Sequence, residues 1–202
     1  MKILTALLAA TVAAVAPVTA IGADSPLNLT ISQENAAKLP YTTLGTMVST
    51  PGQSFDEFLG EVGRALRTFS DKTKFEACGE LASTPDKSRY GIVITTNKSH
   101  LGCVIRIGLI PDGMAELGVT IHSHGGQGRF NMNRVDMKLA GVYDVASIMR
   151  IPISGENLYH FSPTDYAGGP GYLATPDGVI YQDGTPGKYT VVPVSGARVA
   201  TR

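Results

Sequence analysis

The chain has 202 residues, of which 43% are hydrophobic, and its 17 basic and 17 acidic side chains cancel. This length and this apolar content suit one soluble domain with a substantial core. A net charge of zero leaves no electrostatic footprint for nucleic acid or for an anionic membrane, so neither is an expected partner.

The first 23 residues have the pattern of a cleaved signal peptide. Lys2 provides a short positive start, Ile3–Val15 is an apolar run, and small residues follow it. The run is short for the ~30 Å hydrocarbon core of a bilayer, and no later stretch is suited to span one. We therefore expect an exported protein, periplasmic or secreted, in which residues 24–53 form a loosely ordered leader.

One clear helix and a series of strands are expected after the leader. Ser54 and Glu57 form a capping box, and apolar residues then recur at helical spacing, which predicts a helix over Ser54–Thr68. The predicted strands, separated by turn-forming residues, are Phe75–Leu81, Tyr90–Thr96, Cys103–Ile110, Leu117–Ser123, Tyr172–Thr175, Val179–Tyr181 and Tyr189–Val194. Asn131–Arg150 is compatible with a helical face, and residues 195–202 are expected to form a frayed tail.

The two cysteines, Cys78 and Cys103, lie in neighbouring predicted strands. In an exported chain an even number of cysteines favours a disulfide, and closing this loop stabilises the fold by roughly 3 kcal/mol on the chain-entropy model. A pair of buried free thiols is the alternative. The absence of a C-x-x-C motif argues against cysteine ligands for a metal.

Two of the four histidines, His122 and His124, are spaced as H-x-H at the end of a predicted strand. Residues i and i+2 of a strand project from the same face, so both imidazoles can reach one ion. An aspartate such as Asp165 would complete a three-ligand site with one position open for water, which is typical of catalytic zinc. The alternative is two surface histidines at a strand end. His100 is expected to be solvated. His160, just before the Ser162 phrase, is expected to be a surface histidine, with a contact to a ligand residue or to the substrate as the alternative.

Hydrolysis at a metal also needs a general base and a hydrogen-bond donor for the developing oxyanion. Glu76, in the segment Glu76-Ala77-Cys78-Gly79, is the candidate base. Ser162, three residues before Asp165, is the candidate donor. Glu80 is an alternative base, because on a strand it would face the same way as Glu76, but only Glu76 is followed by x-x-Gly.

An E-x-x-G segment followed by H-S-H and then S-x-x-D resembles the JAB/MPN (JAMM) metallopeptidase family. The resemblance implies an α/β fold of the α+β type, with a mixed, curved sheet flanked by helices in one domain, here residues 54–194. Carried over position by position, the family's base falls on Glu76 and its oxyanion-side serine on Ser162. The family's three Zn²⁺ ligands fall on His122, His124 and Asp165. The implied activity is hydrolysis of peptide or isopeptide amide bonds in a peptide or protein substrate, here outside the cytoplasm.

The chain departs from the family pattern in one spacing. Between His124 and Ser162 lie 37 residues, where the family has far fewer. Either residues 125–161 are an insertion that loops out over the site, or the S-x-x-D match is fortuitous and Asp136 or Asp144 is the third ligand. A catalytically inactive JAB-fold binding module and a secretion-associated or toxin-like domain are the alternative functions.

Overall fold

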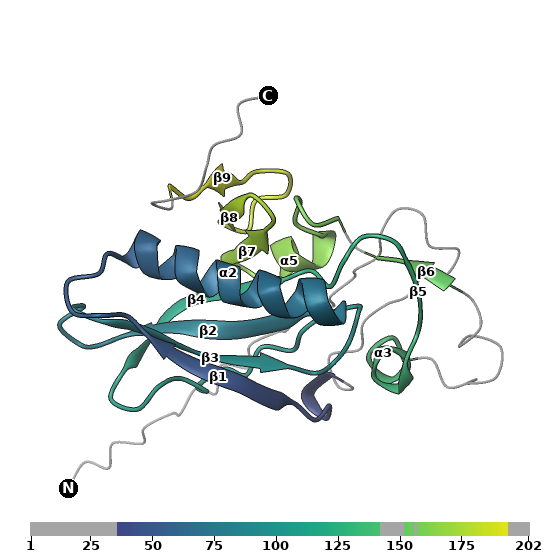
Figure 1. Cartoon of the computed structure of the whole chain (residues 1–202), viewed down its shortest axis with the longest axis horizontal. Coiled ribbons are helices and arrows are strands. Elements are labelled where there is room, and N and C mark those ends of the chain that lie inside the picture. The colour runs from purple at the N-terminus through teal and green to yellow at the C-terminus, as the bar shows by residue number, and fades with distance from the viewer. Residues whose placement is uncertain (1–35, 142–151, 156, 194–202) are drawn as a thin grey trace, which may run out of the picture.

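The expected fold class is confirmed by the computed structural model, which describes residues 36–141, 152–155 and 157–193. It is an α+β fold in which a seven-stranded mixed sheet carries one long helix across a face (Figure 1). The expected signal peptide and the tail at 195–202 lie outside the described residues. Within the described part, no helix is both long enough and apolar enough to cross a membrane.

The sheet has the strand order β1-β3-β2-β4-β7-β8-β9. Its strands are β1 (Thr42–Val48), β2 (Ala77–Ser83), β3 (Tyr90–Thr96), β4 (Ala115–Ser123), β7 (Gly171–Thr175), β8 (Gly178–Gln182) and β9 (Thr190–Val191). Only β4 and β7 pair in parallel, and the predicted hairpin over β7 and β8 is confirmed. The strand that carries the histidines therefore lies in the middle of the sheet. Its His122 has Cys78 of β2 and Leu173 of β7 as lateral neighbours.

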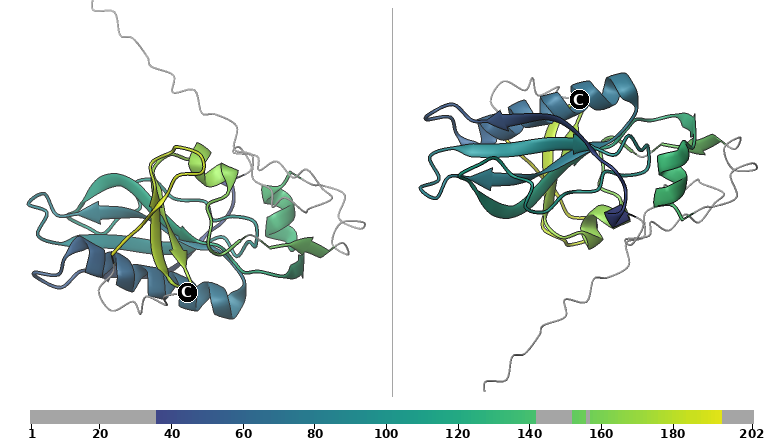
Figure 2. Two further views of the ribbon diagram at one scale, coloured as in Figure 1. Left: turned by 90° about the horizontal axis from the view of Figure 1, so that it is seen from above. Right: turned by 90° about the horizontal axis from the view of Figure 1, so that it is seen from below.

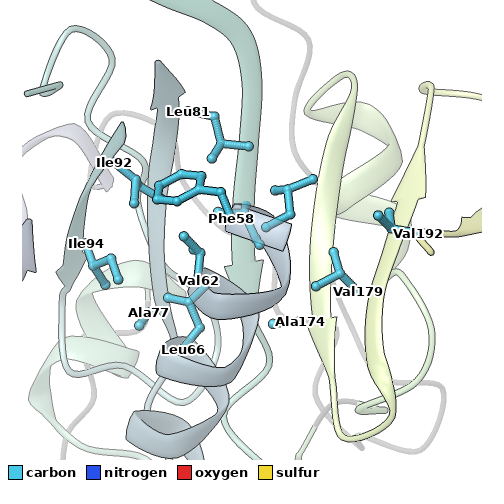
Figure 3. Packing of buried hydrophobic residues seen from close by; sticks show 12 residues of the cluster. Phe58, Val62, Leu66, Ala77, Leu81, Ile92, Ile94, Ala174, Val179 and Val192 are labelled. Atoms are coloured by element: carbon cyan, nitrogen blue, oxygen red, sulfur yellow. The ribbon is translucent and has the colours of Figure 1, made fainter. Parts of the chain in front are cut away.

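The long helix α2 (Phe55–Thr73) covers one face of the sheet (Figure 1). The predicted capping box is present, with Ser54 as N-cap and Glu57 as its partner. The helix continues past the predicted end at Thr68 and stops at Lys74, which has a positive φ of 67°. Its apolar stripe and the inner sheet face form the core shown in Figure 3, which includes Phe58, Leu59, Val62, Leu66, Ala77, Leu81, Ile92, Ile121, Ala174 and Val179.

Strand alternation assigns the candidate site to the opposite face of the sheet. On β2, Leu81 packs in the core beneath α2, whereas Cys78 and Glu80 point away from the helix and bond to the segment that covers the other face. On β4, Ile121 packs in the core, so the adjacent His122 projects to the same outer face as Cys78.

The prediction of a loosely ordered leader over residues 24–53 is wrong for its second half. That stretch contains β1, which pairs antiparallel with β3, so the sheet begins before the predicted domain boundary at Ser54. β1 is an edge strand whose side chains are exposed, except for the partly buried Met47. An edge strand of this kind needs no apolar alternation, which is why the pattern gave no strand signal.

The predicted strand Cys103–Ile110 is also wrong, because residues 102–106 form no strand and a turn follows at 107–108. Both edges of β2 are taken by β3 and β4, and β1 takes the outer edge of β3. The segment instead crosses the face opposite α2. There the predicted disulfide between Cys78 and Cys103 is present, with the two Cα atoms 5.8 Å apart. We refer to residues 101–107 as the tethered segment.

The described part of the expected insertion (residues 125–141, 152–155 and 157–161 of 125–161) includes a small unit beyond the end of the main sheet (Figures 1 and 2). Its described part contains β5 (Arg129–Asn131) paired with β6 (Pro152–Ser154), and α3 (Arg134–Leu139). Of the helical face expected over Asn131–Arg150, only α3 falls in the described residues. The chain then enters α5 (Pro163–Ala167), which leads directly into β7.

Candidate metal centre

The three side chains expected as metal ligands converge at one point. His122 lies near the end of β4, His124 follows that strand, and Asp165 lies on α5. Nε2 of His122 is 3.1 Å from Oδ1 of Asp165, and Nε2 of His124 is 3.3 Å from Oδ2. The two Nε2 atoms are 3.3 Å apart. This group can hold a metal ion.

These separations agree with a tetrahedral ion. Two ligands at about 2.0–2.1 Å from a tetrahedral centre are about 3.3 Å from each other. The two Nε2 atoms are separated by about that edge length, 3.3 Å, and each lies 3.1 or 3.3 Å from one oxygen of Asp165, His122 from Oδ1 and His124 from Oδ2. Three side chains fill three corners of such a tetrahedron, and the fourth corner is left for water or substrate.

The serine between the two histidines faces the core rather than the site. Ser123 is buried, and its Oγ lies 2.7 Å from Oγ of Ser70 on α2. The same hydroxyl lies 3.3 Å from the carbonyl oxygen of Ala77 on β2. These contacts join β4 to the helix and to its neighbouring strand, so that His122 is held on the outer face.

A hydrogen bond from the insertion sets the tautomer of His124. Its Nδ1 lies 2.6 Å from the carbonyl oxygen of Asn157. A carbonyl oxygen can only accept, so Nδ1 carries a proton; in the neutral imidazole, the form that binds a metal, the lone pair is then on Nε2, the nitrogen that faces His122 and Asp165. Metal-binding histidines are commonly oriented in this way.

The backbone of His124 is held from α2. Nη1 of the buried Arg67 donates to the carbonyl oxygen of His124 at 2.7 Å. The next residue, Gly125, passes so close to the end of α2 that a Cβ there would lie 2.2 Å from the carbonyl oxygen of Lys74. Only glycine fits this approach, so Gly125 belongs to the framework of the site as well as to the start of the insertion.

The S-x-x-D phrase is the capping box of α5. The backbone N–H of Ser162 donates to Oδ2 of Asp165 at 2.7 Å, and the N–H of Asp165 donates to Oγ of Ser162 at 3.3 Å. Burial raises the pKa of Asp165, but the charges and hydrogen bonds of His122 and His124 outweigh burial and hold that pKa well below its usual range. The carboxylate is therefore ionised, as a metal ligand must be.

Asp136, a rival third ligand, is fully occupied elsewhere. Its buried carboxylate accepts hydrogen bonds from Oγ of Ser99 and the N–H of His100, both at 2.7 Å, and from the N–H of Asn133 at 2.8 Å. Nδ1 of His100 completes the set at 2.8 Å. Asp136 therefore caps α3 and ties it to a loop. The other rival, Asp144, lies outside the described residues.

The expectation that His100 is solvated is wrong. Its ring lies between those of Phe75 and Phe130, with centroid distances of 4.7 and 4.4 Å, and its ring nitrogen pairs with Asp136. The aromatic partners come from distant segments, so nothing in the local sequence signalled this burial. His160 is exposed, as expected.

The candidate base Glu76 lies in the same cavity as the ligand cluster. This cavity has a volume of about 700 Å³, and its walls include Glu76, His122, Ser162 and Asp165. Glu76 is only 3% exposed, and its carbonyl oxygen accepts from Oγ1 of Thr96 at 2.6 Å. Both candidate catalytic residues therefore line the same cavity as His122 and Asp165.

The rival base Glu80 has a structural role. Its Oε2 accepts from the backbone N–H of Gly108 at 2.8 Å, which holds the turn after the tethered segment against β2. Glu80 is not part of the cavity wall. Glu80 shares a face of β2 with Cys78, whereas Glu76, expected on the same strand, precedes β2.

Two supporting residues were not predicted from the sequence. Arg67 lies on α2, for which the sequence indicated only a capped amphipathic helix. Gln182, buried at the end of β8, donates from Nε2 to the carbonyl oxygen of Asp165 at 3.0 Å and to that of Gly169. In the sequence, the only signal for Gln182 was a polar residue directly after the apolar strand Val179–Tyr181. Its burial in the structure requires hydrogen-bond partners.

The chain matches no protein-family model, no curated protein and no solved structure. The JAB/MPN resemblance therefore rests on the motif residues and their order alone.

Proposed function

We propose that this protein is a zinc-dependent hydrolase of peptide or isopeptide amide bonds that acts outside the cytoplasm. The observation that carries the proposal is the convergence of His122, His124 and Asp165 at one point, with the buried Glu76 lining the same cavity as His122 and Asp165. Two imidazoles and one carboxylate form a donor set typical of catalytic zinc. The disulfide suits an oxidising compartment, which supports the proposed location.

The residues of the chain divide the work of such a reaction between them. A bound zinc ion supplies Lewis-acid polarisation of a carbonyl and a water of lowered pKa. Glu76 accepts the proton of the attacking water and delivers it to the leaving nitrogen, as a general base and then a general acid. Asp165 stays ionised because the two histidines lower its pKa. Asn157 keeps the proton of His124 on Nδ1.

Ser162 is the proposed donor to the oxyanion. Its Oγ accepts the N–H of Asp165 as the N-cap of α5, and a hydroxyl that accepts one bond still has its own proton to donate. Because Ser162 lines the cavity, that proton can be directed at a developing negative charge on the substrate. The same side chain would thus position a ligand and stabilise the transition state.

The proposal is tested by replacing the base without changing its shape. Glu76→Gln cannot accept a proton, so we expect unchanged zinc content and folding, with hydrolysis reduced at least ~10²-fold. Glu80→Gln is the matched control, because Glu80 bonds to Gly108 outside the cavity, and its activity is expected to stay within a few-fold of wild type. Zinc content is measured by elemental analysis and cleavage by mass spectrometry of a peptide library.

Normal turnover in Glu76→Gln would show that Glu76 is not the base. A wild-type protein that binds zinc but cleaves nothing in the library would favour an inactive binding module with the same fold.

A further inference from the structure

The tethered segment forms one wall of the cavity that contains the metal centre. The disulfide joins Cys103 to Cys78, which is the lateral neighbour of His122 in the sheet. The segment is therefore held directly beside a proposed ligand. Together with short stretches that precede β1 and end α3, it contributes an apolar set of cavity residues: Ala36, Ala37, Leu101, Val104, Ile105, Ile107 and Leu139.

The charged side chains that line the cavity belong to an arginine that holds the chain before β1 and to two residues of the proposed site. Arg106 is the only lysine or arginine among the described lining residues. Its two Nη atoms donate to the carbonyl oxygens of Ala37 and Leu39, and its guanidinium lies 5.0 Å from the ring centre of Tyr41. Arg106 therefore holds the chain before β1 against the tethered segment. The lining carboxylates belong to Glu76 and Asp165, which are residues of the site itself.

One apolar side chain of this wall is left open to water. Ile107 is 71% exposed although it lines the cavity. Covering such a side chain with an apolar group removes apolar surface from water and is favourable, whereas a charged group gains no comparable stabilisation from it. The apolar side chains of this wall therefore favour substrates with an apolar group at this position.

We propose that the tethered segment is the specificity wall of the site, and that preferred substrates carry a large aliphatic or aromatic side chain next to the cleaved amide bond. This inference rests on the proposed hydrolase function. An amide carbonyl at the open metal position lies beside His122, and the wall begins at the neighbouring disulfide. The side chain of the residue next to the amide is thus the part of the substrate that meets the wall.

The first test measures binding rather than turnover. Short peptide hydroxamates, which bind zinc through the hydroxamate and are not cleaved, are compared by calorimetry with the zinc-loaded wild-type protein. The compounds differ only in having leucine, glutamate or lysine next to the hydroxamate. We expect the leucine compound to bind ~10–200-fold more tightly, the range over which apolar pockets discriminate.

A matched pair of variants locates that preference. Ile107→Glu is expected to reduce the preference for leucine over lysine to within about threefold, because it adds a carboxylate to the wall. Val191→Glu is the control, because Val191 on β9 is 73% exposed and does not line the cavity. It should keep the wild-type preference. Circular dichroism of both variants checks that they fold.

The second test identifies cleavage sites in a peptide library. The wild-type protein and Val191→Glu should enrich Leu, Ile or Phe at one position next to the cut, and Ile107→Glu should shift that position towards Lys and Arg. Cleavage without any side-chain preference, together with equal hydroxamate affinities, would overturn the specificity wall and leave the hydrolase intact. A leucine preference in binding without any cleavage would support the wall and overturn the hydrolase. Absence of both zinc binding and cleavage would overturn both.

Discussion

Two aspartates of this chain begin helices in the same way and then differ in what their carboxylates contact. Asp136 and Asp165 each close a capping box, with Asn133 and Ser162 as the respective N-caps. Both oxygens of Asp136 are taken up by buried hydrogen bonds from protein donors. Oδ1 of Asp165 instead faces His122. Whether such a residue can serve a metal is therefore decided by what surrounds its second oxygen.

This difference predicts opposite results for the two alanine variants. Asp165→Ala removes a ligand and should release most of the zinc. Asp136→Ala should retain zinc but lower the free energy of unfolding by about 1–3 kcal/mol or more, because buried donors lose their acceptor. Metal analysis after dialysis and denaturant unfolding separate the two effects. Retention in Asp165→Ala with loss in Asp136→Ala would place the third ligand in the insertion.

The lowered pKa of Asp165 predicts how the metal-free protein responds to acid. Below the ordinary aspartate pKa of about 3.9, the unfolded chain binds a proton that the folded chain does not. The contribution of Asp165 to the free energy of unfolding is therefore fully present above that pH. It is lost as the pH falls through the lower pKa that Asp165 has in the folded protein. In chelator-treated protein, the free energy of unfolding should decrease less steeply below about pH 4 in Asp165→Asn than in wild type. Equal slopes would contradict this.

At the scale of elements, the sequence predicted those helices and strands whose signals lie within the element itself. The α2 cap, β3 and the histidine strand β4 were predicted because caps, alternation and turns are local signals. β1 was missed because an exposed edge strand lacks alternation, and the tethered segment was misread because strand-like residues found no sheet edge to join. Register across the sheet, which places Cys78 beside His122, is not encoded locally.

The disulfide between Cys78 and Cys103 predicts the behaviour of the tethered segment. Exported protein denatured without reductant should show no free thiol in a thiol titration. Replacing both cysteines with alanine should lower the free energy of unfolding by about 3–4 kcal/mol, the chain-entropy value for a sequence separation of 25. Two titratable thiols in unreduced protein would contradict the pairing.

At the scale of the whole molecule, the metal centre joins segments that are far apart in the chain. Asp165 is 41 residues from His124, and the residues that orient His124 are also distant in the sequence, with Arg67 at 57 residues and Asn157 at 33. The three residues of the group that could hold a metal were predictable because each lies in a short motif. Their supporting contacts were not, because each depends on how α2 and the insertion pack around the end of β4. An ion at this point would cross-link the end of β4 and α5.

That cross-link predicts a metal-dependent gain in stability. Because the unfolded chain does not hold the three ligands together, zinc at 100 times its dissociation constant should add about 2.7 kcal/mol to the free energy of unfolding. For a domain of this size, that gain corresponds to a rise of about 5–10 °C in the unfolding temperature. The measurement is thermal unfolding followed by circular dichroism after chelation and again after zinc is restored. His122→Ala should lose the increment, and His160→Ala, which replaces an exposed histidine outside the cluster, should keep it. An equal increment in His122→Ala would mean that the stabilising ion binds elsewhere in the molecule.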